Sequence, residues 1–338
     1  MTAAADPTQR LGRAGGNDGT DQAVRLVAWA NIFLLGMFLA QTVAVIVGGF
    51  PAPSAALSGE GGVGSWIMLL LYPAAALAAV LYVARTPLIG LREDCDRISA
   101  FNITLVRGAF FAVLFVGIVD ASLSFMRIED FLAPIVGQEL SDSLGRSLFR
   151  GPWVHIPLTA LGFAVGIFFA RGTLGFTWLA LLIVVAELLI VISRFVFSYE
   201  QSFMGDLVRF WYAALFLFAS AYTFYDEGHV RVDVLYAGMR RSSKGVVNAV
   251  GCLVLGLTLC WTILLLGMSA STAAIVAPML KFEIPQATTG MYVKWMMAGY
   301  LAFFAITMLI QFCASLMDAV ADWRGHPGHR DHDPVAPA

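Results

Sequence analysis

The sequence predicts an all-α integral membrane protein, a helical bundle of about eight transmembrane helices. The 338 residues are 59% hydrophobic and 13% charged, with a mean hydropathy of +0.78, whereas soluble domains carry about 25% charged residues. The apolar residues stand in long unbroken runs and do not alternate with polar ones, which favours helices over the strands of a membrane barrel. Water is therefore not the main solvent of this chain.

Each apolar run is long enough to be a helix that crosses or nearly crosses a bilayer. The first extends from about residue 26 to 49, and about 20 residues are needed to span the hydrocarbon core. This run is too long for the apolar core of a cleavable signal, so we expect an uncleaved first helix. Seven further runs lie near residues 66–84, 104–126, 153–170, 174–197, 208–225, 246–271 and 291–317.

The basic residues predict the orientation of the bundle. Eight crossings place both termini on the same side of the membrane. With the N-terminus inside, the cytoplasmic segments hold 14 of the 21 Lys and Arg residues and the other side holds seven. Since cytoplasmic loops carry an excess of Lys and Arg, both termini are predicted to be cytoplasmic.

The pattern divides the chain into four segments. Residues 1–24 are rich in Gly, Ala and Asp and contain too little apolar surface to order, so they are predicted to be a disordered cytoplasmic N-terminus. Residues 25–172 form an N-terminal four-helix membrane extension, and residues 173–320 form a second four-helix membrane domain. Residues 321–338 are a polar cytoplasmic tail.

Several classes of function are disfavoured by composition. A formal net charge of -2 gives no basic field for nucleic acid. The four cysteines contain no CxxC pair, so we expect neither a disulfide nor a metal site. His155 is the only histidine close to an apolar run and has no evident partner in the sequence, which argues against a haem carrier. Without a phosphate loop or nucleophile motif, we expect no cofactor and no catalytic residue.

Charged residues inside the runs each need an explanation, because Asp, Lys or Arg at a helix centre costs about 2.5 to 3.5 kcal/mol to insert. Glu187 lies near the middle of the fifth run, and Arg194 follows seven residues later on the same helical face. Glu187 is either a proton or cation ligand, or a structural group that is protonated or hydrogen-bonded to a neighbouring helix or subunit. The same two readings apply to Asp120. Because Arg127 follows it closely, we expect Asp120 to lie near the membrane interface.

One loop is a candidate for interfacial chemistry. The segment 85–101, between the second and third runs, contains a cluster of charged residues, Arg92, Glu93, Asp94, Asp96 and Arg97. It is either a catalytic cluster of a lipid-modifying enzyme or a solvated loop that holds the neighbouring helix ends at the headgroups.

Three motifs in the C-terminal half carry a family resemblance. Arg194-Phe195 closes the fifth run, Asp206 to Arg209 opens the sixth, and Gly228-His229-Val230-Arg231-Val232-Asp233 follows the sixth. In type and spacing this series resembles the small permease subunit of the tripartite ATP-independent periplasmic (TRAP) transporters, the DctQ-like family. The resemblance covers about residues 174–320. It leaves the four N-terminal helices unexplained, because members of that family commonly have four helices in total.

The motif residues also have a physical reading of their own. Arg194 at a helix end can reach the headgroups, and Asp206 near the start of the next helix places negative charge at the positive end of its dipole. His229, Arg231 and Asp233 alternate with valines, so an extended backbone would present them together on one side. We predict partner-interface or structural roles for these residues, as for Glu187 and Arg209.

The resemblance implies a function for the whole chain. It implies the small scaffold subunit of a sodium-coupled uptake system in the bacterial inner membrane, which transports an organic anion such as a carboxylate. The implied partners are a large TRAP permease subunit, a periplasmic substrate-binding protein and membrane lipids. The alternatives are a self-sufficient eight-helix secondary transporter and a membrane-embedded enzyme.

Overall fold

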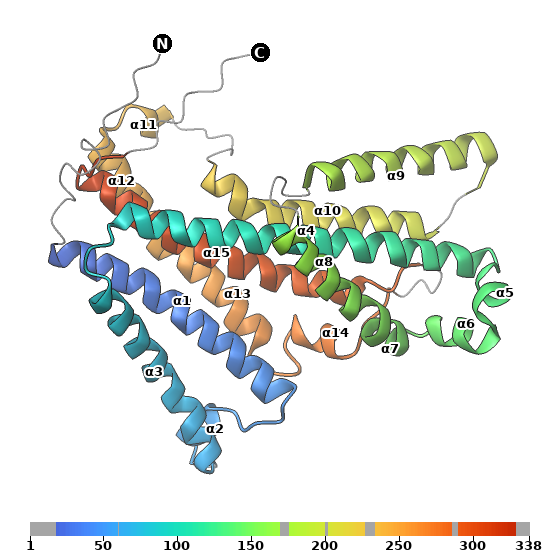
Figure 1. Ribbon diagram of the computed structural model, residues 1–338, viewed down its shortest axis with the longest axis horizontal. Helices are drawn as coiled ribbons and strands as arrows, with labels where there is room; N and C mark the ends of the chain where they lie inside the picture. The colour runs from blue at the N-terminus through green and yellow to red at the C-terminus, as the bar shows by residue number, and fades with distance from the viewer. Residues whose placement is uncertain are drawn as a thin grey trace. The chain divides into compact units, whose positions relative to one another are not determined.

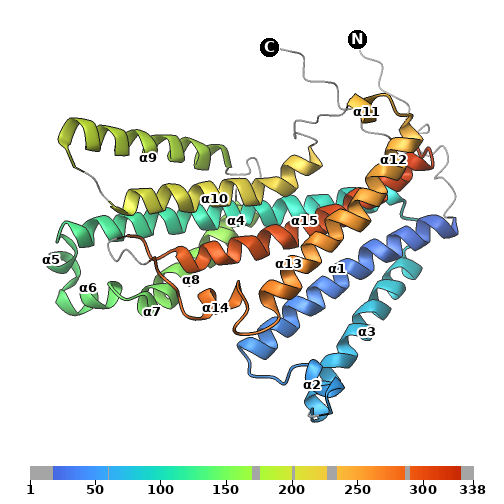
Figure 2. The ribbon, with the colours of Figure 1, turned by 180° about the vertical axis from the view of Figure 1, so that it is seen from behind.

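The computed structural model describes residues 18–59, 61–169, 176–199, 202–226, 234–285 and 290–328. Within these ranges the regular structure is entirely helical and contains no strand. Figure 1 and, from behind, Figure 2 show the helices. The predicted all-α class is confirmed.

Eight helical segments of the described residues are long and apolar enough to cross a membrane. They are Gly19–Ile46, Val63–Arg85, Leu91–Ile128, Ser147–Phe168, Leu179–Phe197, Phe203–Tyr225, Arg241–Met268 and Lys294–Trp323. Each of them corresponds to one of the eight predicted apolar runs, which confirms a multi-pass membrane bundle.

Two predicted boundaries differ from the structure. Helix α1 (Gly19–Ile46) begins inside the segment expected to be disordered, so residues 19–24 are helical. Helix α4 (Leu91–Ile128) contains most of the segment 85–101 that was expected to be a loop. Apolarity locates only the part of a helix that lies in lipid. Polar turns that continue such a helix therefore do not show in an apolar run.

The chain divides into two compact units, and each consists of segments that are separated in the sequence. The first contains the described residues up to Ser99, those from 234 to Thr258, and those from Leu309 onward. The second contains those from Ala100 to 226 and from Leu259 to Met308. Each unit thus has segments from both sides of residue 173, where the predicted domain boundary lies.

In the first unit, α1 packs along α3 (Val63–Arg85), as both views show. A short helix, α2 (Ser54–Leu57), precedes α3. Arg25 of α1 and Asp94 of α4 are fully buried and form an ion pair of 2.6 Å. The Arg25 guanidinium also donates to the carbonyl and hydroxyl oxygens of Thr86, each at 2.8 Å. Asp94 is therefore a buried structural group and not a solvated loop residue.

A second set of ion pairs in the first unit holds the end of α15 (Lys294–Trp323). Arg92 pairs with Asp318 and, at 2.7 Å, with Asp322. Arg241 also reaches Asp322, at 3.0 Å, from the start of α12 (Arg241–Val250). These bonds fix the helix ends at one level of the unit. Because α15 ends at Trp323, the first three residues of the predicted polar tail, 321–323, are helical.

The start of α1 is attached to the same end of α15. Arg324 donates to Asp18 at 2.8 Å and to Asp21 at 3.0 Å. The hydrogen bond from Arg324 is the main reason that the pKa of Asp18 lies below its usual range, and the N–H of Gly19 adds to it. The first unit is completed by α11 (Val234–Ala237) and by a π-helical segment, η3 (Gly251–Leu257), that continues α12.

In the second unit, α9 (Phe176–Phe197) packs along α10 (Ser202–Tyr225), as Figures 1 and 2 both show. The aromatic ring of Phe218 on α10 lies 4.8 Å from that of Tyr300 and 4.6 Å from that of Phe303, both on α15. The remaining helices of this unit are α5 (Leu132–Val136), α6 (Gln138–Leu144), α7 (Ser147–Arg150), η2 (Gly151–His155), α8 (Ile156–Phe168), α13 (Thr258–Met268, from Leu259) and α14 (Val276–Leu280).

Candidate functional site: a buried ionic network in the second unit

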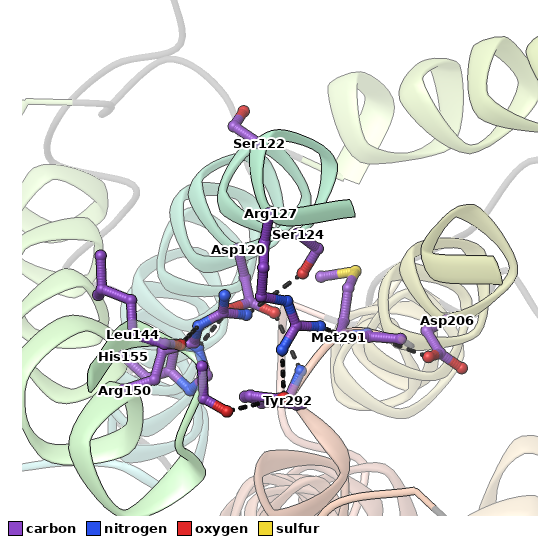
Figure 3. A network of polar contacts seen from close by, with 12 residues as sticks. Asp120, Ser122, Ser124, Arg127, Leu144, Arg150, His155, Asp206, Met291 and Tyr292 are labelled. Carbon is purple, nitrogen blue, oxygen red and sulfur yellow. Dashed lines mark hydrogen bonds and ion pairs between the residues drawn. The ribbon is translucent and has the colours of Figure 1, made fainter. Parts of the chain in front are cut away.

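The side chain of Asp120 is the centre of a network of polar contacts within the second unit (Figure 3). It is fully buried two turns before the end of α4. Its Oδ1 accepts from Arg150 Nη1 at 2.9 Å and contacts His155 Nε2 at 2.7 Å. Its Oδ2 accepts the backbone N–H of Tyr292 at 3.1 Å. His155, for which no partner was evident from the sequence, thus contacts Asp120, and Asp120 is a buried, hydrogen-bonded group.

A π-helical turn brings Arg150 and His155 to the same carboxylate. The two residues are five positions apart, which in an α-helix places side chains about 140° apart around the axis. The segment η2 between them has the wider i to i+5 hydrogen bonding of a π-helix, and the N–H of Ile156 bonds the carbonyl of Gly151. Because the wider turn aligns positions i and i+5, both side chains reach Asp120.

Two residues constrain the backbone around the π-turn. Pro157, at the start of α8, has no N–H with which to bond the carbonyl of Trp153 in an α-helical pattern. Gly151 also lacks room for a side chain, since an added Cβ would lie 2.1 Å from Phe282 Cδ1.

Tyr292 is the second centre of the network. The guanidinium carbons of Arg127 and Arg150 each lie 4.7 Å from the centre of its ring, a distance at which cation–π attraction operates. Its hydroxyl donates to the carbonyl of Gly145 at 2.9 Å and also contacts Arg127. Ser124 and the carbonyl of Leu144 accept further bonds from Arg150. The network thus joins α4, the α6–η2 segment and the residues before α15.

Asp206, a predicted site residue, belongs to the edge of this network. Its Oδ2 accepts the N–H of Met291, next to Tyr292, at 3.2 Å. Arg209, another predicted residue, lies 3.6 Å from Asp206 but is mostly exposed. Asp206 stands beyond the first turn of α10, so its contact with the backbone before α15 is a more direct role than the expected interaction with the helix dipole.

The other predicted site residues are not brought into the network. Glu187 and Arg194 are exposed on α9. Glu187 has no hydrogen bond or ion pair with any part of the chain that the structure describes. His229, Arg231 and Asp233 lie outside the described residues. Of the predicted site residues that the structure describes, Asp206 contacts the network, and Arg209 lies at its exposed edge.

The geometry of the network favours a structural role over substrate binding. Both oxygens of Asp120 are already hydrogen-bonded, and an ionised carboxylate only accepts, so His155 carries its proton on Nε2. Charges removed from water are stable only when paired and hydrogen-bonded. Among the described residues no group of three or more His, Cys, Asp or Glu side chains is placed to hold a metal. The network acts as a clamp between helices.

Sequence reasoning missed Arg150, His155 and Tyr292, although one signal was present. A carboxylate inside an apolar run requires a cationic partner, and the next helix along the chain opens with Arg150 and His155. Tyr292 lies 172 positions from Asp120, and no local pattern connects them.

Comparison with protein families gives a match in the C-terminal part of the chain. Residues 181–322 match the family described as "Tripartite ATP-independent periplasmic transporters, DctQ component". Comparison with curated proteins and with solved structures gives no significant match. The matched range contains Asp206 and Tyr292, whereas Asp120, Arg150 and His155 precede it, so the network joins the matched region to helices outside it. Over residues 181–322, the chain is thus similar to the DctQ component of the tripartite ATP-independent periplasmic transporters.

Proposed function

We propose that this chain is the small, stationary membrane subunit of a sodium-coupled TRAP-type transporter that takes up an organic anion such as a carboxylate. It works with a large permease subunit, which carries the transport sites, and with a periplasmic substrate-binding protein. The observation that carries the proposal is the DctQ match over residues 181–322. The four preceding helices enlarge the scaffold.

The interior of the second unit supports a scaffold and not a self-sufficient transporter. The buried carboxylate of Asp120 is saturated by groups of the same chain, so it offers no free ligand to a cation. The large cavity of this unit, about 740 Å³, is lined almost wholly by apolar side chains. A carboxylate substrate would find no cationic group among the described lining residues, which disfavours the alternative of an eight-helix carrier.

The exposed face of α9 is the surface best suited to the large permease. Val184, Leu188 and Phe195 are 63%, 56% and 79% exposed, while Leu179, Ile183 and Ala186 face inward. Glu187 lies on this helix without a partner among the described residues. A carboxylate at membrane depth requires a donor or cation, so we assign its partner to the permease.

The orientation places the ionic network on the outer side of the inner membrane. With cytoplasmic termini, as the positive-inside count predicts, the third crossing ends outward and the fourth, sixth and eighth crossings begin there. Asp120, Arg150, Asp206 and Tyr292 all lie near these helix ends. The network then stiffens the surface on which a periplasmic binding protein docks.

Replacement of Glu187 by leucine tests the proposed subunit contact. We expect Glu187→Leu to reduce co-purification of the large permease in mild detergent, because the permease loses its buried ionic or hydrogen-bonding partner. The isolated subunit should keep or gain thermal stability, since a lone carboxylate is removed from lipid. The measurement is the ratio of the two subunits after affinity purification, together with the melting temperature.

A matched control is Glu93→Leu, which removes an exposed carboxylate of α4 and should leave co-purification unchanged. Substitution of Arg231 and Asp233 is expected to weaken assembly in the same assay. If Glu187, Arg231 and Asp233 can all be replaced without loss of assembly or uptake, the assigned contact is wrong.

Reconstitution separates the proposed function from its alternatives. Liposomes that contain this chain alone should accumulate no solute, whereas liposomes with both membrane subunits, a sodium gradient and the binding protein should. Uptake by the chain alone would overturn the scaffold assignment. Turnover of lipid by the purified chain would instead favour the membrane enzyme.

A further inference from the structure

The cavity of the second unit is an elongated groove between α4, α8 and α15. Its volume is about 740 Å³, within the range of about 300–1,000 Å³ typical of sites for small organic ligands. One wall is a stripe of α8 from Ile156 to Phe168. At about 1.5 Å per residue this stripe is about 18 Å long, slightly more than half of a hydrocarbon core of about 30 Å.

Three polar side chains in the wall of this groove have no hydrogen-bond partner among the described residues. They are the Trp295 indole N–H and the hydroxyl groups of Tyr300 and Thr159. Trp295 and Tyr300 are only 7% and 4% exposed. A buried polar group without a partner is destabilising, so three of them beside one cavity indicate a ligand that bonds at least some of them.

The type of unpaired group defines the chemistry of that ligand. An indole N–H can only donate, so the ligand must present an acceptor oxygen. The other lining residues are almost all apolar, for example Ala160, Phe163 and Phe303, so the rest of the ligand is an apolar chain. Trp295 is the second residue of α15 and thus lies near the membrane interface, where tryptophan is enriched and lipid ester groups are found.

We infer that the groove binds a membrane phospholipid, with one acyl chain along α8 and its ester carbonyl oxygens accepting hydrogen bonds from Trp295 and Tyr300. The donor atoms are themselves almost fully buried. Met279 and Met296, the most flexible side chains of the wall, move aside to admit the ester group.

A transmembrane helix of the permease is a poorer occupant of the groove. The backbone groups of a helix are bonded internally, so it has few acceptors to offer to Trp295 and Tyr300.

Native mass spectrometry of the purified full chain tests the lipid site with two probes. One is a diester phosphatidylethanolamine, and the other is the diether analogue of the same chain length, which lacks the ester carbonyls. We expect the diester to bind more tightly, by about two- to tenfold for each of the two hydrogen bonds. The double variant Trp295→Phe with Tyr300→Phe should bind both lipids equally and remain as stable as the unsubstituted chain.

Filling the groove tests the place of the acyl chain. Ala160→Phe should abolish binding of both lipids at this site, whereas Leu161→Phe, on the same helix but outside the groove, should not. Equal affinity of the unsubstituted chain for diester and diether lipids would overturn the inference. So would unchanged lipid binding by Ala160→Phe, and loss of permease co-purification in that variant would then identify a protein-binding groove.

Discussion

Arg150→Met is expected to lower the stability of the folded chain by about 3–5 kcal/mol, the typical effect of breaking a buried ion pair by removing one partner. The substitution leaves the Asp120 carboxylate buried with His155 and the N–H of Tyr292. It also removes the hydrogen bond to the carbonyl of Leu144 and the cation over the Tyr292 ring. Asp120→Leu should have an effect of similar size, because Arg150 then becomes the unpaired buried charge.

The double variant Asp120→Leu with Arg150→Met should be more stable than the sum of the two single effects predicts. A buried pair replaced on both sides by apolar groups is often nearly neutral, and residues in direct contact couple by about 0.5–3 kcal/mol. The measurement is unfolding of the purified chain by titration with a denaturing detergent, followed through secondary structure. All four members of the cycle are compared in one lipid mixture.

The pair Glu93–Arg97 on the same helix is the matched control. These side chains are 54% and 51% exposed and lie four residues apart, and such exposed pairs contribute about 0.3–0.5 kcal/mol. Arg97→Met should therefore change stability much less than Arg150→Met. If both variants have equal small effects, the network is not a stabilising clamp.

The fold class could be predicted because membrane-spanning helices require long runs of apolar residues, which are visible in the sequence. Runs of about 20 apolar residues have one physical explanation in a chain with 13% charged residues. All eight runs became helices. The helix ends were less predictable, since Asp94 was assigned to a loop but is buried in a helix and paired with Arg25. A charged residue at a helix end does not show whether water or an opposite charge accompanies it.

The ionic network could not be predicted because its members are distant in the chain. Asp120 and Tyr292 are 172 positions apart, and only the folded bundle brings them together. Arg150 and His155 are only five positions apart in the sequence. Even so, their side chains would point in different directions on an α-helix, and it is the π-turn η2 that directs both to Asp120. The family motifs did locate Asp206, which reaches the rim of the network through Met291.

The network also bears on the four helices that precede the matched region. Asp120 and Arg150 belong to those helices, whereas Tyr292 and Asp206 belong to residues 181–322. The described residues on both sides of the predicted boundary near 173 are therefore joined by buried bonds. A chain truncated to residues 173–338 would lose Asp120, the partner of the Tyr292 N–H.

Gly162→Leu is the second substitution expected to have a large effect, because α8 and α4 touch at this point through their backbones. A Cβ at residue 162 would lie 2.6 Å from both Ala112 Cα and the carbonyl oxygen of Phe111. One turn further, a Cβ at Gly166 would lie 2.8 Å from Gly108 Cα. Small residues four apart allow such close approach between membrane helices.

We expect Gly162→Leu to lower stability by about 3 kcal/mol or more, at the upper end of the usual effect of overpacking. Gly36→Leu is the control, since Gly36 is exposed on α1 and has nothing within 4 Å of an added Cβ. It should be neutral or slightly stabilising, because glycine is a poor helix former. Melting temperatures of the two purified variants in the same detergent give the comparison.

Second-site substitutions distinguish a backbone contact from a side-chain contact. An added Cβ at Gly117 would lie 2.1 Å from Trp211 Nε1, a side-chain atom, so Trp211→Leu should partly rescue Gly117→Ala. The atoms facing Gly162 are backbone atoms, so Ala112→Gly should not rescue Gly162→Leu. Rescue in the second case, or a melting temperature of Gly162→Leu equal to that of the unsubstituted chain, would mean that α8 does not rest directly on α4. Because Arg150 and His155 lie on the same continuous helical segment as Gly162, the position of the ionic clamp depends on this contact.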